Sequence, residues 1–344
     1  MGRGLSSAPF TGDAVGGYIN AMNINAATKT SSHALSVYYP PMAMHENLVV
    51  VTSALVTKIV FSDSRDEKGD ILATGISYTK DSHSCTAVAK REVVLAASAL
   101  QTPKLLELSV WDWFCGSAFG SGYSEFVQSL LRSPTEGSGG YFSYTALGNF
   151  IPEAGSGDTI GKQNASTSSD TKDGAASPGN YLTIACMLLH PLSRENTHIT
   201  SSDPEITPQI DPKCLSHPLD LAILSRHVRY NSKIISPPPL STHLKPSGRR
   251  NHGAPSDIMD LDAVKEYAKK AALSAWHPTS TCAVLPSEKG GVVSEKLIVY
   301  GTKNLRIVGA SIFPLSTRSN CQTTVYAVAE EVADMIRGDY GIKV

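Results

Sequence analysis

Short apolar blocks separated by turn-forming residues dominate the first third of the chain. Blocks rich in Val, Ile and Leu are typical of β-strands, and blocks of this length at this spacing predict an antiparallel meander. A charged turn at residues 64–69 and a polar turn at residues 81–84 separate three of the predicted strands. The predicted strands cover residues 47–52, 55–61, 73–79 and 88–95.

The last of these strands leads into a predicted helix within residues 98–106, with Pro103 in its first turn, where a missing N–H is tolerated. Asp260 is the expected N-cap of a later helix, and Gly338 is the expected stop of the last one. Two further strands and three amphipathic helices are predicted from apolar periodicity: strands at 182–190 and 197–199, and helices at 217–230, 261–274 and 323–337.

Two segments between the predicted elements have no regular pattern. Residues 153–180 are dominated by Gly, Ser, Thr, Asp and Ala, a composition that buries little apolar surface, so we expect a disordered, exposed loop. Residues 111–122 are aromatic and Gly-rich without a clear period. Neither segment carries a motif that identifies a substrate.

Composition argues against several classes of function but does not identify one. The chain has 344 residues, of which 41% are apolar and 18% charged, as in ordinary globular proteins with room for two domains. A net charge of −1 argues against binding to nucleic acid or to an anionic membrane. No apolar run is long enough to cross a bilayer and no signal core is visible, which favours a cytoplasmic protein. The six cysteines form no CxxC pair, so neither a metal site nor a disulfide framework is expected.

Two polar residues in the C-terminal part are candidates for chemistry. His277 follows a predicted helix and precedes Pro278, and its small or apolar flanks predict partial desolvation that would keep the imidazole neutral as a base. A structural histidine bonded to backbone is the alternative. Asn320 precedes the last predicted helix, whose first N–H groups lack partners. It is either an N-terminal cap or a residue facing an electron-rich group at that helix end.

The segments around both candidates resemble the signatures of glucose-methanol-choline (GMC) flavoprotein oxidoreductases. Residues 277–282, HPTSTC, are similar to the family's histidine motif, and residues 304–330 to its closing signature, in which the second active-site residue is His or Asn. The segment WHPTSTC, residues 276–282, is more similar to fungal family members that act in secondary metabolism, including polyketide pathways, than to sugar oxidases. Further similar segments are 45–59, 97–109, 188–194, 203–204 and 210–212.

This resemblance implies FAD as the cofactor and a small-molecule alcohol as the substrate. His277 would take the hydroxyl proton as the carbon's hydride passes to flavin N5, and Asn320 would hydrogen-bond the same oxygen. No metal, nucleic acid or membrane partner is implied, and the oligomeric state is left open. The implied FAD contacts are Val56 towards the adenosine, and Gly309, Ala310, Cys321, Gln322 and Thr323 beside the isoalloxazine.

The resemblance also implies a mixed α+β and α/β fold. Residues 1–110 would form an incomplete FAD-binding domain, a β-meander plus helices. Residues 111–270 would form a substrate domain built on an antiparallel sheet. Residues 271–344 would carry the catalytic motifs and return to the FAD-binding domain.

The sequence departs from the family pattern at several points. No GxGxxG phosphate fingerprint follows a first strand, and the acidic ribose-binding residue has no counterpart, so we expect the chain to lack the family's first part. Ser98 stands where the family usually has Gly, and Gly309 where Asp is common. After Ser109 the expected Gly-rich continuation is missing.

Three hypotheses follow from these observations. The favoured one is an FAD-dependent alcohol oxidase or dehydrogenase. The second is a truncated and catalytically impaired relative, because the phosphate fingerprint is absent. The third is a redox-neutral cyclase or lyase on the same scaffold, with His277 as an acid and base.

Overall fold

The computed structural model describes residues 23–109, 129–130, 132–133, 137–144, 182–245, 253–318 and 320–342. The predicted disordered loop at residues 153–180 and the irregular segment at residues 111–122 lie outside the described residues.

The predicted meander is confirmed. Strands β1 (Ala54–Arg65), β2 (Ile71–Lys80) and β3 (His83–Val88) form an antiparallel sheet in the order β1-β2-β3. Ile59 and Ala73 are buried where this sheet meets the core. Gly75 is required for the pairing of β2 with β3, because a Cβ there would lie 2.1 Å from the Ala87 carbonyl oxygen.

Two of the strand predictions were wrong in detail. Residues 47–52 form no strand: Val49 is 80% exposed, and this extended run pairs with no described strand. β-propensity alone does not produce a strand, because strand stability comes from packing and pairing with neighbours. The predicted strand at 88–95 is two strands, since β3 ends at Val88 and β4 (Val93–Leu95) begins after a change of partner from β2 to β9.

A short parallel pair forms the centre of the core. Strand β4 pairs with β9 (Leu305–Ile307), and helix α3 (Ser98–Leu108) follows β4 directly. Leu305 and Ile307 are completely buried, and they pack with Leu106 of α3 and Val332 of α7 (Gln322–Asp339). This packing places the loops that follow β4 and β9 at one edge, where α/β sheets commonly bind ligands.

The prediction that Pro103 lies in the first turn of α3 was wrong, because Pro103 lies in the helix interior. A proline there cannot donate to the carbonyl four residues earlier, which belongs to Ala99. The Thr281 hydroxyl donates to that carbonyl instead, at 2.6 Å. The helix therefore continues through Pro103 because a side chain from another segment supplies the missing donor.

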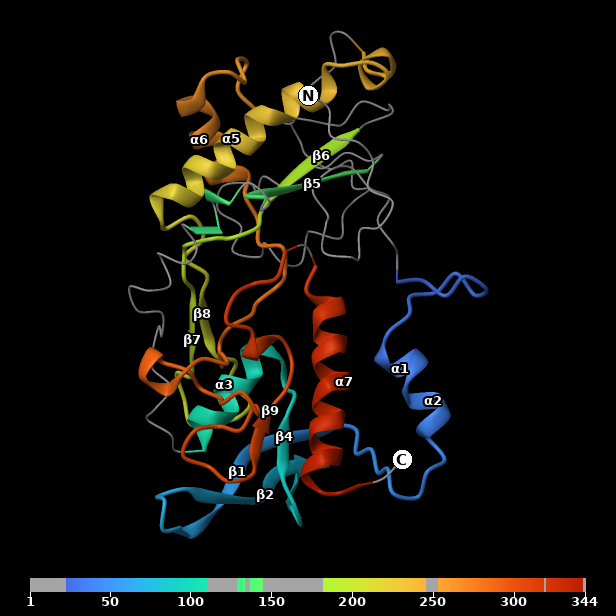
Figure 1. The fold of residues 1–344 in the computed structure, drawn as a ribbon, viewed down its shortest axis with the longest axis vertical. Helices are drawn as coiled ribbons and strands as arrows, with labels where there is room; N and C mark the ends of the chain where they lie inside the picture. Colours follow the sequence, from blue (N-terminus) through green and yellow to red (C-terminus); the bar gives the residue numbers. More distant parts are fainter. Residues whose placement is uncertain are drawn as a thin grey trace.

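A second group of elements lies above the parallel pair in Figure 1, and a further strand pair lies lower, beside α3. Strands β5 (Gly139–Tyr144) and β6 (Thr183–Leu188) are antiparallel, as are β7 (Asn196–His198) and β8 (Gln209–Asp211). Helices α5 (Pro218–Ile235) and α6 (Leu261–Ala271) pack on each other, and α5 also covers β6. The predicted strands in this region are confirmed, and α5 continues five residues beyond the predicted end at 230.

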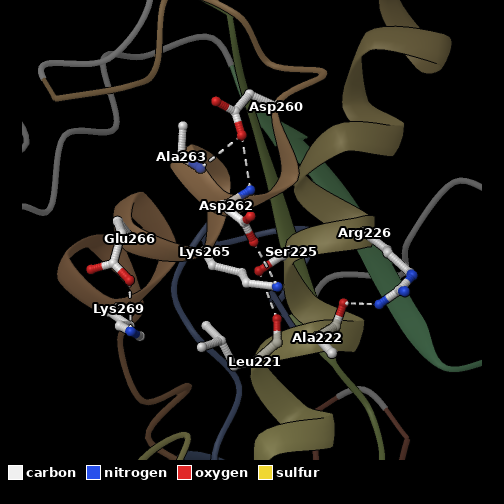
Figure 2. Close-up of polar contacts among 10 residues, drawn as sticks. All are labelled: Leu221, Ala222, Ser225, Arg226, Asp260, Asp262, Ala263, Lys265, Glu266 and Lys269. Atoms are coloured by element: carbon white, nitrogen blue, oxygen red, sulfur yellow. Dashed lines mark hydrogen bonds and ion pairs between the residues drawn. The ribbon is translucent and has the colours of Figure 1, made fainter.

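Asp260 caps α6 as predicted. Its carboxylate accepts from the N–H groups of Asp262 and Ala263, and Figure 2 shows this cap beside the exposed Lys265–Asp262 and Lys269–Glu266 pairs. The helix ends at Ala271, three residues before the predicted end.

The stop at Gly338 was wrong, because α7 continues to Asp339. Gly341 takes the left-handed conformation, with φ 61°, and the Ile342 N–H closes the end on the Arg337 carbonyl at 2.9 Å. Glycine ends this helix for the expected reason, but at a later position.

Short helices complete the described part. They are α1 (Ala34–Val37), α2 (Tyr39–Met42), η2 (Leu240–His243), η3 (Ser287–Lys289) and η4 (Ala310–Ile312). Tyr38 stacks on Tyr326 of α7 and donates to Glu330, which holds α1 and α2 beside that helix (Figure 1). Within the described ranges, no helix has the length and apolar character needed to cross a membrane.

Candidate functional site

The segment after His277 runs beside the loop that follows β9. The N–H groups of Cys282 and Val284 donate to the carbonyls of Ser311 and Ile312, at 2.8 Å each. The Val308 N–H donates in turn to the Leu95 carbonyl of β4, at 2.9 Å. These bonds fix the histidine motif at the carboxyl edge of the parallel pair.

His277 and Asn320 lie in direct contact. Nε2 of His277 is 2.7 Å from Oδ1 of Asn320, although 43 residues separate them in sequence. His277 is half-buried and Asn320 is exposed, so their contact is open on one side. Trp276, with φ 54°, takes a left-handed turn immediately before the histidine. The sequence predicted the two residues as members of one site, and the structure brings them together.

Asn320 does not occupy the N-cap position of α7. That position is held by Cys321, which makes no side-chain capping bond. Gln322 and Thr323, in the first turn, are exposed. A helix start of this kind presents unpaired N–H groups and a partial positive charge, which suit an anionic or electron-rich group.

Gly309 lies two residues after β9, immediately before η4, with φ 122°, a conformation that suits glycine. A Cβ built there would meet nothing within 4 Å, so the backbone is open on that side. The Ala310 carbonyl accepts from the Ser280 N–H at 3.2 Å, which places both residues beside the histidine motif. The backbone at Gly309 is therefore accessible beside the histidine motif.

Val56 is not brought to this group. It lies in β1, where it pairs with Tyr78 and packs against the core. Figure 1 places β1 near the end of α7, whereas Asn320 precedes the beginning of that helix. This separation of Val56 from the His277–Asn320 pair suits a contact at the other end of a long cofactor. The contact of Val56 with the adenosine stays a prediction.

Three hydroxyl groups in and around the histidine motif were not identified from sequence as site residues. Thr279 Oγ1 lies 2.8 Å from Ser316 Oγ, and the Thr281 hydroxyl donates to Ala99 of α3. The signal for Thr281 was present in Pro103, whose position inside a helix requires a substitute donor. No comparable signal exists for Ser316, because its partner is distant in sequence.

A hollow of about 530 Å³ adjoins the same segments. Its walls come from the loop after η4 and from Thr324 and Val328 of α7, and Ser316 connects it to the histidine motif. Its lining is mostly apolar, with a few polar groups, as in small-molecule sites. The lining residues are Leu130, His190, Val284, Ile312, Phe313, Pro314, Leu315, Ser316, Thr317, Arg318, Thr324 and Val328.

Cys282 lies in the histidine motif as a buried thiol. Burial raises the pKa of the Cys282 thiol to about 12, so it stays protonated. No group of three or more potential metal ligands occurs among the described residues.

Comparison with known proteins places the chain in one family. The C-terminal GMC oxidoreductase model matches residues 191–329, and the N-terminal GMC oxidoreductase model matches residues 4–111. A GMC oxidoreductase family protein of Malassezia sympodialis, Mala s 12, is 28% identical over 98% of this chain and 64% of its own length. The dehydrogenase mpl7 of Monascus purpureus is 26% identical over 97% of this chain and 68% of its own length.

Solved structures show the same fold. An FAD-dependent oxidoreductase from Chaetomium thermophilum matches with a TM-score of 0.65 and 20% identity, over 93% of this chain and 67% of that one. A fungal aryl-alcohol oxidase matches with a TM-score of 0.62 and 21% identity, over 90% of this chain and 64% of that one. The chain spans less than two thirds of the Malassezia relative. The two family models together cover most of its residues, and the chain belongs to the GMC oxidoreductase family, whose cofactor is FAD.

Proposed function

We propose that this chain carries the alcohol-oxidising end of an FAD-dependent GMC oxidoreductase. The observation that supports the proposal is the 2.7 Å contact between His277 Nε2 and Asn320 Oδ1. His277 would accept the hydroxyl proton of the alcohol, and Asn320 would bind the oxygen from which that proton leaves. FAD supplies the hydride acceptor when it is bound.

The two side chains satisfy each other in this structure, so an alcohol oxygen must replace their mutual bond. With Oδ1 facing Nε2, the imidazole donates and Nε2 carries the proton. To act as a base through Nε2, His277 must present a lone pair there. That requires the tautomer with the ring proton on Nδ1, and rotation of the Asn320 amide by half a turn would then let Nδ2–H donate to a substrate oxygen placed between the two groups.

The residues that would hold FAD are those at the open edge. Gly309 allows close approach of the ring, and the N–H groups of Gln322 and Thr323 at the start of α7 would stabilise negative charge. Val56 is proposed to contact the adenosine end. A diphosphate cradle of the glycine-rich kind is absent from the sequence, so this chain alone is expected to bind FAD weakly.

The substrate is proposed to be a small organic alcohol, in particular a secondary metabolite of polyketide type. The hollow beside Ser316 is mostly apolar and would hold the body of such a molecule, with its hydroxyl at His277. The relatives include fungal dehydrogenases, and a neighbour in structure is an aryl-alcohol oxidase, which agrees with an apolar alcohol.

Reduction of added FAD by an aryl alcohol tests the proposal. Under anaerobic conditions, the chain with excess FAD and 4-methoxybenzyl alcohol should bleach the flavin absorbance near 450 nm. His277→Gln should slow this by about a hundredfold or more, the usual size of a general-base effect. No bleaching above free FAD with any alcohol of an aryl and polyketide-like panel would contradict the proposal.

A catalytically impaired relative is the second candidate, because no glycine-rich phosphate fingerprint occurs in this sequence. A ligand that binds the folded state must raise the melting temperature. If saturating FAD leaves the melting temperature unchanged, the impaired form is favoured. A redox-neutral cyclase or lyase would instead convert its substrate with His277 but without bleaching FAD.

A further inference from the structure

The hydrogen bond between the hydroxyls of Thr279 and Ser316 lies close to the proposed catalytic pair. The two oxygens are 2.8 Å apart, and Thr279 is 8% exposed. Thr279 follows His277 by two residues, and Ser316 precedes Asn320 by four. The bond therefore joins the two segments near the point from which the imidazole and the carboxamide project.

Backbone pairing holds the same segments together only further along. Cys282 and Val284 donate to the loop after β9, and the Ser280 N–H makes a longer bond to Ala310, at 3.2 Å. Pro278 has no N–H with which to continue towards His277. The hydroxyl pair lies nearer in sequence to the His277–Asn320 contact than any of these backbone bonds.

We propose that Thr279 and Ser316 are positioning residues that hold His277 and Asn320 at the distance needed for alcohol oxidation. The inference rests on the proposed function and deepens it. Both side chains are short, so the hydroxyl contact tolerates little relative movement of the two segments. A displacement of about 1 Å between reacting groups can cost about a hundredfold in rate, which makes such a bond consequential.

Histidine NMR tests the positioning without requiring turnover. The chain is labelled with ¹⁵N at histidine and asparagine, and the His277 signals are assigned by their loss in His277→Gln. In wild type, an NOE should connect the His277 ring to the Asn320 amide. In Thr279→Val and in Ser316→Ala the NOE should weaken at least twofold, and the ring ¹⁵N shifts should move towards those of a free imidazole.

Two variants control for a merely structural effect. Thr279→Ser keeps the hydroxyl and should restore the NOE and the ring shifts. Thr302→Val removes a hydroxyl bond of the same 2.8 Å length at a residue that is 5% exposed and is not among the site residues. It should lower the melting temperature to a similar degree but leave the His277 signals unchanged.

Kinetics provide the second arm, using the chain with FAD and the alcohol found active. Thr279→Val should lower kcat about tenfold with little change in KM, and Thr279→Ser should recover most of the loss. If neither Thr279→Val nor Ser316→Ala alters the NOE, the ring shifts or kcat, the positioning role is overturned. If wild type never turns over, the proposed oxidation fails, while the NMR arm still decides whether these hydroxyls position the pair.

Discussion

Ser98 occupies a backbone conformation that disfavours a side chain. Its φ is 72°, and left-handed geometry costs a non-glycine residue about 1–2 kcal/mol. Its Oγ offsets part of this by facing the N–H groups of Leu100 and Gln101, at 3.3 and 3.5 Å, near the start of α3. The position therefore combines a conformation suited to glycine with a helix cap suited to serine.

Substitution at Ser98 separates these two effects. Ser98→Ala loses the cap and keeps the strain, and should lower the free energy of unfolding by about 1 kcal/mol. Ser98→Gly loses the cap but relieves the strain, and should stay within about 0.5 kcal/mol of wild type. Urea denaturation of the three proteins measures this. An alanine variant as stable as the glycine variant would show that the assigned strain or cap is wrong.

Cys282 should be chemically silent in the folded chain. It is completely buried, and burial raises the pKa of its thiol to about 12. Cys214 is exposed, although partial burial of its sulfur also raises its thiol pKa. Because the thiolate is the reactive form, iodoacetamide at pH 8 should modify Cys214 in the native chain and Cys282 only after addition of urea. Mass spectrometry of peptides reads the two sites separately, and early labelling of Cys282 would contradict its burial.

At the scale of elements, α3 depends on the histidine motif for one of its own hydrogen bonds. Thr281→Val keeps the side-chain volume but leaves the Ala99 carbonyl without its donor. An unpaired buried acceptor costs about 1–3 kcal/mol, so the free energy of unfolding should fall by that amount. Thr281→Ser keeps the hydroxyl and serves as the control. If valine and serine variants unfold at the same urea concentration, the Thr281 bond does not support α3.

The β5–β6 pair is connected to α5 through a half-buried histidine. His227 contacts the Tyr141 and Ser138 hydroxyls through Nδ1 and Nε2, at 2.5 and 3.0 Å. A Cβ on Gly139 would lie 2.5 Å from its ring, so glycine is needed for this packing. Burial lowers the pKa of His227 below its ordinary value of 6.5. The folded state therefore favours a neutral ring between two hydroxyls.

This lowered pKa makes stability depend on pH. Below about pH 6.5 the unfolded chain binds a proton at this position more readily than the folded chain. The contribution of His227 is therefore complete above that pH and is lost as pH falls towards the lower pKa of the folded state. His227→Gln should reduce the fall in unfolding free energy between pH 7 and pH 5. If the unfolding free energy of wild type and variant depends equally on pH, His227 is not a source of that dependence.

The elements that sequence predicted well are those whose signals are local. Asp260 precedes a helical apolar pattern, and the apolar blocks at 55–61 and 73–79, separated by a charged turn, were enough to place β1 and β2. The predictions that failed concern contacts between segments that are distant in the sequence. Residues 47–52 have the composition of a strand but pair with no described strand, and α3 continues through Pro103 because Thr281, 182 residues from Ala99, supplies a donor. Motif resemblance singled out His277 and Asn320 as candidates, but the Thr279–Ser316 hydroxyl bond near them becomes visible only in three dimensions.

At the scale of the molecule, one buried guanidinium joins the main layers. Arg306 of β9 is 2% exposed, and its side chain donates to Glu92 before β4, to Asp339 at the end of α7 and to the Lys296 carbonyl. The bond to Asp339 spans 2.9 Å and the contacts to Glu92 span 3.2 Å. The parallel pair and the helix whose start faces the proposed flavin edge are therefore connected through one side chain.

Removing this cation should affect folding of the whole described core. Arg306→Met retains much of the apolar length but leaves the Glu92 carboxylate, itself 8% exposed, without its partner. Breaking a buried ion pair in this way typically costs about 3–5 kcal/mol, because the remaining charge stays desolvated. Arg337→Ala, which removes an exposed arginine paired with Asp334 within α7, is the matched control and should cost less than about 1 kcal/mol.

Urea denaturation followed by circular dichroism measures the stability of both variants. A double variant, Arg306→Met with Glu92→Gln, separates the effect of charge from the effect of packing. Neutralising Glu92 removes the unpaired charge, so the double variant should recover part of the stability that Arg306→Met loses. Recovery would assign the loss to desolvated charge. If the double variant is as unstable as Arg306→Met, the loss comes from packing around the guanidinium and its bonds to Asp339 and Lys296. If Arg306→Met is no less stable than Arg337→Ala, the ion pair does not hold the layers together.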